Sequence, residues 1–84
     1  MHTIKVLGPG CPNCRKLEEV ARQALNMIGL EAEITKVTDY AEIMNYNILA
    51  TPGLVINEKV VSSGRIPSPA EVSTWLADAV IANG

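Results

Sequence analysis

Residues 3–14 read Thr3-Ile4-Lys5-Val6-Leu7-Gly8-Pro9-Gly10-Cys11-Pro12-Asn13-Cys14. The first five of these residues are mostly apolar or β-branched, which predicts a short buried strand. Gly8-Pro9-Gly10 interrupts that strand. Pro12 suits the first position of a helix, because the N–H that proline lacks would have no helical partner there. This stretch therefore predicts a strand, a loop and a helix, with two cysteines where the loop enters the helix.

The segment that follows has the periodicity of a helix. Apolar side chains recur at spacings of three and four, namely Cys14, Leu17, Ala21, Ala24, Leu25 and Ile28. Gly29 comes directly after them and suits a left-handed C-cap. We therefore predict a helix over residues 12–28 that turns Cys14 toward the core.

A second strand and a short helix are predicted next. Residues 31–37 alternate polar and apolar side chains, which is typical of a half-buried or edge strand. Thr38-Asp39 offers an N-cap for a helix over residues 40–46. That helix would bury some of its apolar side chains, Met44 among the candidates.

The C-terminal part predicts a hairpin and a last helix. Two apolar runs, 54–56 and 59–62, are joined by too few residues for anything but an antiparallel turn. Ser68 is a good N-cap and Pro69 a good first residue for the helix that follows. Its apolar stripe extends to Val80.

The resulting order is β-α-β-α-β-β-α. Strands joined through a helix are usually parallel with a right-handed crossover. We therefore predict an α/β fold, a four-stranded mixed sheet with helices on both faces, as a single domain over residues 1–84.

Composition excludes several classes of function. Seven basic and nine acidic residues give a net charge of −2, and no three basic residues are consecutive. Nucleic-acid binding would require a basic patch. No apolar run approaches the ~20 residues that cross a bilayer, and Gly8 interrupts the N-terminus before a signal-peptide core could form. We expect no nucleic-acid or membrane partner and a cytoplasmic location, which is reducing.

The cysteine count argues against a structural role. A secreted domain of this size usually carries four, six or eight cysteines, whereas this chain has two. A bridge between Cys11 and Cys14 closes a four-residue loop, which gives ~2 kcal/mol against ~3 for a fifteen-residue loop. A structural zinc site needs four ligands, and His2 is the one histidine available to add to the pair. We expect no metal.

The positions of the two cysteines differ in a way that suits thiol–disulfide exchange. Cys11 stands at the start of the helix, where unpaired N–H groups and the helix dipole favour a thiolate. Arg15 and Lys16 add positive potential, so we predict a Cys11 pKa below the ~8.5 of an ordinary thiol. Cys14 faces the core. Cys11 would attack a target disulfide, and Cys14 would then resolve the mixed disulfide.

Three motifs carry a resemblance to a known family. They are Gly10-Cys11-Pro12-Asn13-Cys14, Thr51-Pro52-Gly53-Leu54-Val55 and Gly64-Arg65-Ile66. From about Ile4 to Leu76 the chain resembles the thioredoxin superfamily, and more closely its short members called redox-active disulfide protein 2. The resemblance implies a glutaredoxin-sized thioredoxin-like fold with a cis Pro52 beside the redox pair. The backbone of Thr51 would pair with substrate.

The resemblance also implies the site and its partners. Cys11 and Cys14 would be catalytic, Pro12 and Asn13 would complete the redox motif, and Gly10, Thr51 and Pro52 would bind substrate. The protein would be a thiol–disulfide oxidoreductase that reduces protein disulfides. Its reductant would be a protein such as a thioredoxin-reductase-like flavoprotein, and it would need no cofactor beyond the redox-active disulfide.

Two departures from related patterns bear on the chemistry. Thioredoxins carry an acidic residue six positions before the first cysteine, where this chain has Lys5. Glutaredoxins carry Thr-Val-Pro and Gly-Gly-x-Asp for glutathione, where this chain has Ala50-Thr51-Pro52 and Ser63-Gly64-Arg65. The sequence therefore does not support glutathione use and leaves the acceptor of the Cys14 proton open, with water as the simplest.

Two other functions stay open. Cys11 and Cys14 could bind a soft metal or metalloid as thiolates in a carrier. Heavy-metal-associated domains have the order β-α-β-β-α-β, however, which differs from the order predicted here. The chain could also be a non-catalytic thioredoxin-fold interaction module.

Overall fold

The computed structural model describes residues 2–10, 12–48 and 50–83. The strands are β1 (His2–Leu7), β2 (Ala32–Val37), β3 (Gly53–Ile56) and β4 (Lys59–Ser63). The helices are α1 (Pro12–Ile28), α2 (Tyr40–Met44) and α3 (Pro69–Asn83). This order is the one that the sequence predicts.

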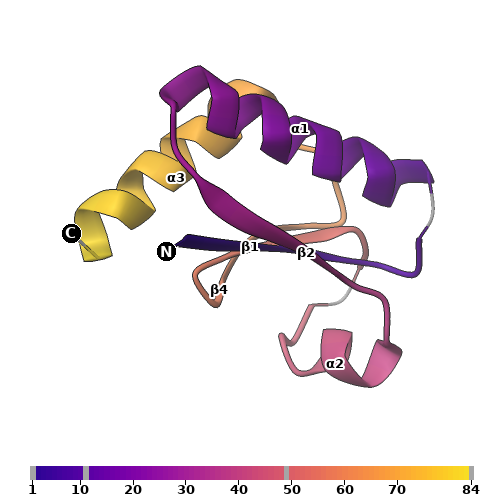
Figure 1. Cartoon of the computed structure of the whole chain (residues 1–84). Coiled ribbons are helices and arrows are strands. Elements are labelled where there is room, and N and C mark those ends of the chain that lie inside the picture. Colours follow the sequence, from indigo (N-terminus) through magenta and orange to yellow (C-terminus); the bar gives the residue numbers. More distant parts are fainter. Residues whose placement is uncertain (1, 11, 49, 84) are drawn as a thin grey trace.

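The strands form one mixed sheet in the order β2-β1-β3-β4. β1 runs parallel to β2 and antiparallel to β3, and β3 and β4 form the antiparallel hairpin. Helices α1 and α3 lie on one face of the sheet and α2 lies below the other (Figure 1). The predicted α/β fold, with a mixed four-stranded sheet covered on both faces, is therefore confirmed.

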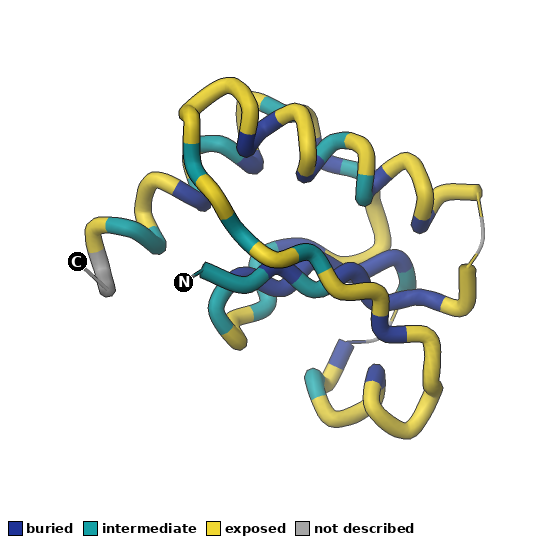
Figure 2. The backbone as a smooth tube through the Cα atoms, in the orientation of Figure 1, coloured by how far each residue is buried: buried dark blue, intermediate teal, exposed yellow. Residues whose placement is uncertain are grey.

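The core is divided by the sheet into two clusters, because successive side chains of a strand point to opposite faces. Ile4 and Val6 of β1 lie in the larger cluster, with apolar side chains of α1, β3 and α3. Leu7 lies in the smaller cluster with Ile43 and Ile48. Figure 2 shows the buried backbone positions concentrated in the central strands and on the inner sides of α1 and α3. β1 therefore contributes buried side chains to the core clusters on both faces of the sheet.

The helix boundaries follow from local chemistry. Gly29 has a φ of +65°, in the left-handed region that glycine favours. The Leu30 N–H bonds to the Leu25 carbonyl at 3.1 Å, which closes the end of α1. Asp39 caps α2 through the Ala41 N–H at 3.0 Å. The Ser68 hydroxyl accepts the Glu71 N–H at 3.2 Å and caps α3.

Two predictions about packing were wrong. Ile28 was expected on the core stripe of α1, but its side chain is 41% exposed, because Leu25 is the last buried residue before the chain leaves the sheet. Met44 is 60% exposed. α2 ends at Met44 rather than at residue 46, so it has little more than one turn and buries Ile43.

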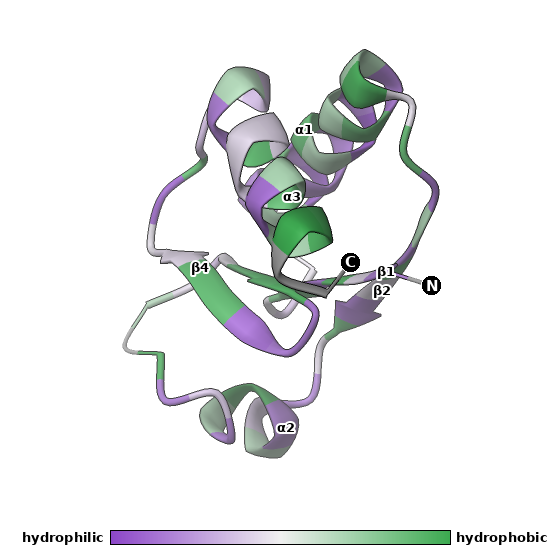
Figure 3. Ribbon diagram, turned by 90° about the vertical axis from the view of Figure 1, so that its left-hand side faces the viewer, coloured by the Kyte–Doolittle hydropathy of each residue, from purple (hydrophilic) through white to green (hydrophobic). Residues whose placement is uncertain are grey.

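Helix α3 is apolar on more than one side, as its C-terminal half shows (Figure 3). Leu76 is fully buried between α1 and the sheet cluster, whereas Ile81, five residues later, is 79% exposed. The two side chains are similar in size but differ in the surface they lose on folding. This pair isolates the energetic contribution of the core.

Replacing Leu76 by Ala should lower the free energy of unfolding by about 2–5 kcal/mol, because it leaves a cavity in the larger cluster. Ile81→Ala is the matched control on the same helix and should change it by less than about 0.5 kcal/mol. Urea unfolding followed by circular dichroism measures both. Similar losses from the two variants would contradict the assignment of the core.

Candidate active site

The first turn of α1 presents the C-terminal half of the cysteine motif. Pro12 is the first helical residue, and Pro12 and Asn13 are both exposed. Cys14 is 6% exposed and packs in the larger core cluster. Gly10 is exposed and has a φ of +90°, which suits glycine. The predicted attacking residue, Cys11, lies outside the described residues.

Gly8 lies directly against Cys14. A Cβ atom built on Gly8 would overlap the Cys14 Sγ and would lie 3.9 Å from the Thr51 Cβ. The Gly8 N–H donates to the Val37 carbonyl at 2.9 Å, which fixes the glycine at the end of β1 beside β2. Gly8 thus brings together the helix that carries Cys14 and the loop that carries Thr51.

The loop before β3 is held on its other side by Gly64. The Thr51–Pro52 peptide bond is cis, and Pro52 is buried. The Pro52 carbonyl accepts the Gly64 N–H at 2.9 Å. Gly64 has a φ of +76°, and a Cβ built there would lie 3.1 Å from the Ala50 Cβ. The three motifs that the sequence singled out therefore meet at one end of the sheet.

A pocket of about 240 Å³ opens beside Cys14, between the start of α1 and the end of β2. Its lining residues are Val6, Gly8, Gly10, Cys14, Arg15, Glu18, Lys36 and Thr38. Thr51 and Pro52 do not line it. Of these residues, Gly10 and Cys14 were predicted to belong to the site and Arg15 to add positive potential, whereas Glu18 and Lys36 were not predicted from the sequence.

Glu18 is the carboxylate of this pocket, one helical turn after Cys14. Arg22 donates to its Oε2 at 2.7 Å, and the Lys36 Nζ lies 3.2 Å from its Oε1. The hydrogen bond from Arg22 is the main reason that the pKa of Glu18 lies below its ordinary value, with partial desolvation opposing and Lys36 adding to the effect. Glu18 could have been predicted as a site residue from the spacing of Cys14, Glu18 and Arg22, because residues four apart lie on one face of a helix.

Lys5 belongs to a different cluster. Its ammonium forms an ion pair with Glu58 and bonds to the Tyr46 hydroxyl at 2.9 Å. The hydrogen bond to Glu58, and then the one to Tyr46, raise the pKa of Lys5 above its ordinary value. Lys5 and Val6 point to opposite faces of β1, and Val6 is the one that lines the pocket beside Cys14. The Lys5 ammonium therefore links β1 to the turn of the β3–β4 hairpin through its ion pair with Glu58.

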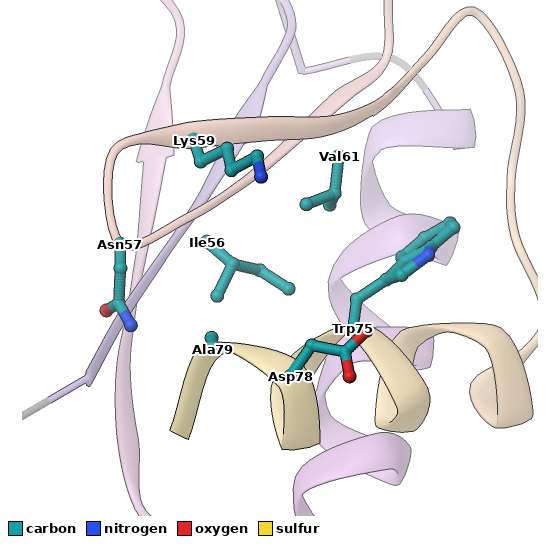
Figure 4. Close-up of a pocket in the computed structure, with 7 residues that line it drawn as sticks. All are labelled: Ile56, Asn57, Lys59, Val61, Trp75, Asp78 and Ala79. Atoms are coloured by element: carbon teal, nitrogen blue, oxygen red, sulfur yellow. The ribbon is translucent and has the colours of Figure 1, made fainter. Parts of the chain in front are cut away.

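A second pocket, of about 370 Å³, lies between the β3–β4 hairpin and α3 (Figure 4). Lys59 and Asp78 approach it from the strand side and the helix side, with Trp75 at one end. Although it is larger than the pocket beside Cys14, none of the site residues predicted from the sequence lines it. The helices in the described part of the chain all lack the length or the hydrophobicity of a transmembrane helix.

The mixed sheet, the Cys-x-x-Cys motif at the start of α1 and the proline loop beside it define a thioredoxin-like α/β protein. The chain belongs to the thioredoxin family, since the family model described as "Thioredoxin domain" matches residues 2–77. The match is to the family as a whole. The closer resemblance to the short redox-active disulfide proteins stays a prediction from the sequence.

Two curated relatives agree with this membership. The chain is 39% identical over 76 residues to a thioredoxin of Methanocaldococcus jannaschii, covering 90% of this chain and 87% of the relative. It is 34% identical over 77 residues to a thioredoxin of Methanothermobacter thermautotrophicus, covering 92% of this chain and the whole relative. Because both relatives are thioredoxins and are 34–39% identical to it, this chain is a thioredoxin-like redox protein.

The fold also matches a solved structure of thioredoxin-2 from a malaria parasite. The TM-score is 0.68, with 93% of this chain and 82% of the other covered. At 9% identity, this likeness bears on the fold alone.

The contact between Gly8 and Cys14 gives a first test of the site. Gly8→Ala should lower the free energy of unfolding by about 1–3 kcal/mol, because the new methyl group collides with the Cys14 Sγ. In a Cys14→Ala background the same change meets a Cβ at 3.6 Å, an ordinary contact, so the loss should be at least about 1 kcal/mol smaller. Urea unfolding under reducing conditions measures the cycle. Equal losses in the two backgrounds would show that the sulfur is not the obstacle.

The carboxylate of the pocket gives a second test. Arg22→Gln should raise the pKa of Glu18 toward its ordinary value, and Lys36→Gln should raise it less, because Arg22 has the larger effect. Since the folded-state pKa is lowered, the stabilisation by this pair is present above the ordinary glutamate pKa and fades as the pH falls through the folded-state value. A ¹³C NMR titration of the Glu18 carboxyl measures the shift, with Lys16→Gln, a change at an exposed position outside the pocket, as the control that should leave it unchanged. A Glu18 pKa insensitive to Arg22→Gln would refute the pairing.

Proposed function

We propose that this protein is a thiol–disulfide oxidoreductase that reduces disulfides in other proteins through Cys11 and Cys14. The observation that carries the proposal is the burial of Cys14 at the first turn of α1, against Gly8 and beside an open pocket. A buried thiol three residues after an attacking thiol is suited to resolving a mixed disulfide and is poorly placed to attack a protein substrate itself. Membership of the thioredoxin family supports this reading.

The reaction has two exchange steps. The Cys11 thiolate attacks one sulfur of the substrate disulfide, and the other substrate sulfur leaves as a thiolate that takes up a proton. Cys14 then loses its proton and attacks the Cys11 sulfur, which breaks the mixed disulfide and releases the second substrate thiol. The substrate gains two electrons and two protons, and the protein is left with a Cys11–Cys14 disulfide.

The surrounding residues have supporting roles in this proposal. Pro12 and Asn13 set the spacing between the two cysteines. The Thr51 backbone pairs with an extended substrate segment, with Pro52 holding that loop and Gly10 leaving room above the motif. Gly8 supports this arrangement because it lies against both Cys14 and Thr51.

The proposal also specifies the partners. The substrates are proteins that contain disulfides, and no cofactor beyond the cysteine pair is needed. A dithiol-donating protein, such as a thioredoxin-reductase-like flavoprotein, returns two electrons to the Cys11–Cys14 disulfide. We place the protein in the cytoplasm, where the reducing environment suits this direction of electron flow.

Removing the resolving thiol tests this mechanism. Cys14→Ser should accumulate a mixed disulfide between Cys11 and a substrate such as insulin, because nothing remains to attack the Cys11 sulfur. Mass spectrometry of the acid-quenched reaction measures the adduct. Cys11→Ser is the matched control and should give less than about a tenth of that adduct, since the remaining thiol is buried.

A lack of any adduct with Cys14→Ser, together with no insulin reduction by the unmodified protein, would refute the proposal. Stoichiometric binding of Cu(I) or Zn(II) by the reduced protein in equilibrium dialysis would then favour the metal carrier. Unchanged partner binding by a Cys11→Ala, Cys14→Ala double variant would favour the interaction module.

A further inference from the structure

We propose that the pocket beside Cys14 binds a carboxylate that the substrate carries close to its disulfide. This inference rests on the proposed function and adds a substrate preference to it. The preferred substrates would be disulfides flanked by acidic groups, with Arg15 as the residue that determines the preference.

The charges around the pocket favour an anion. Both oxygens of Glu18 are engaged, Oε2 by Arg22 and Oε1 by Lys36. Arg15, on the same helix, forms no ion pair within the described part of the chain. The pocket lining thus contains two cations, Arg15 and Lys36, and one carboxylate, Glu18, which Arg22 also neutralises from outside the lining, although the chain as a whole has a net charge of −2. The region of positive charge is therefore local to the pocket.

Arg15 lines the pocket together with two residues of the cysteine motif, Gly10 and Cys14. Gly8 and Gly10 contribute no side chains to the pocket wall, and its volume of about 240 Å³ leaves room for a side chain to enter. Arg15 is exposed and follows Cys14 directly in α1. A guanidinium can bind a carboxylate through two parallel hydrogen bonds. A carboxylate near the scissile disulfide would therefore meet Arg15 when the sulfur atoms meet the motif.

Lys36 and Thr38 complete the opposite wall. Lys36 is the last but one residue of β2 and Thr38 directly follows the strand, so both come from the far side of the pocket from α1. The Lys36 ammonium is held by Glu18 at 3.2 Å, which keeps its charge at the pocket. A ligand carboxylate between Arg15 and Lys36 would be attracted by both cations, and the Thr38 hydroxyl could donate a further hydrogen bond.

The chain offers a matched control for Arg15. Lys16 is the next residue of α1, is exposed and carries the same charge, but it does not line the pocket. Arg15→Gln and Lys16→Gln therefore remove one positive charge each from adjacent positions. A general attraction between the protein and acidic substrates would respond to both changes, whereas binding in the pocket would respond to Arg15 alone.

The experiment compares two disulfide-linked peptides that differ in having glutamate or glutamine beside the disulfide. The ratio of their kcat/KM values is measured for the unmodified protein and for both variants. We expect the unmodified protein to prefer the glutamate peptide by roughly five- to tenfold, between the effect of a fully exposed ion pair and that of a buried charge-assisted hydrogen bond. Arg15→Gln should bring the ratio close to one, and Lys16→Gln should change it by less than about twofold.

The remaining outcomes separate this inference from the function it rests on. Equal reduction of both peptides by the unmodified protein would overturn the inference and leave the proposed oxidoreductase activity intact. Equal effects of the two variants would overturn the pocket and point to general electrostatic steering. Reduction of neither peptide would overturn the proposed function and the inference with it.

A carboxylate beside a disulfide also occurs in glutathione adducts. A peptide carrying a glutathione mixed disulfide, with glutamine at the flanking positions, is therefore assayed in parallel. If Arg15→Gln slows only the glutamate peptide, the carboxylate comes from the polypeptide substrate. If it slows only the glutathione adduct, the pocket binds the tripeptide instead, and the inference about polypeptide substrates fails.

Discussion

The contact between Gly8 and Cys14 is the constraint on which the candidate active site depends. A side chain at position 8 would occupy the space of the Cys14 sulfur, so the start of α1 could not pack as it does on the end of β1. The Thr51 Cβ would lie 3.9 Å from the same added Cβ, and the Gly8 N–H is fixed by the Val37 carbonyl. The glycine after β1 thus positions a helix, a neighbouring strand and a loop at once, which is why three motifs far apart in the sequence can meet.

The distribution of charge follows from the alternation of side chains along β1. Val6 points toward α1 and lines the pocket, whereas Lys5 lies in the cluster with Tyr46 and Glu58. The carboxylate near Cys14 is supplied by the helix, as Glu18, and two cations from different elements keep it ionised. An ionised, compensated Glu18 leaves the pocket with an excess of positive charge. This arrangement links the chemistry proposed for the cysteine pair to the kind of substrate proposed to reach it.

Much of the fold could be predicted from local chemistry, because each boundary has a residue that requires it. Gly29 takes the left-handed conformation at the end of α1, and Ser68 caps α3. The burial of Cys14 was also predictable, because Cys14, Leu17 and Ala21 have the spacing of one helix face. Ile28 was mispredicted, because a periodic pattern does not specify where a helix extends past the sheet it covers, and Met44 was mispredicted because α2 is a single short turn that buries Ile43.

The sequence by itself determined the order of the elements, the caps, the cysteine motif and the inward orientation of Cys14. These depend on interactions between residues within one or two helical turns or within a single turn of the chain. Tertiary structure alone decided that Lys36 and Thr38 face Arg15 and Glu18 across a pocket, and that Gly8 lies close to both Cys14 and Thr51. Those contacts join residues that are distant in the sequence, and they exist because the parallel pairing of β1 with β2 and the antiparallel pairing of β1 with β3 bring three chain segments to one end of the sheet.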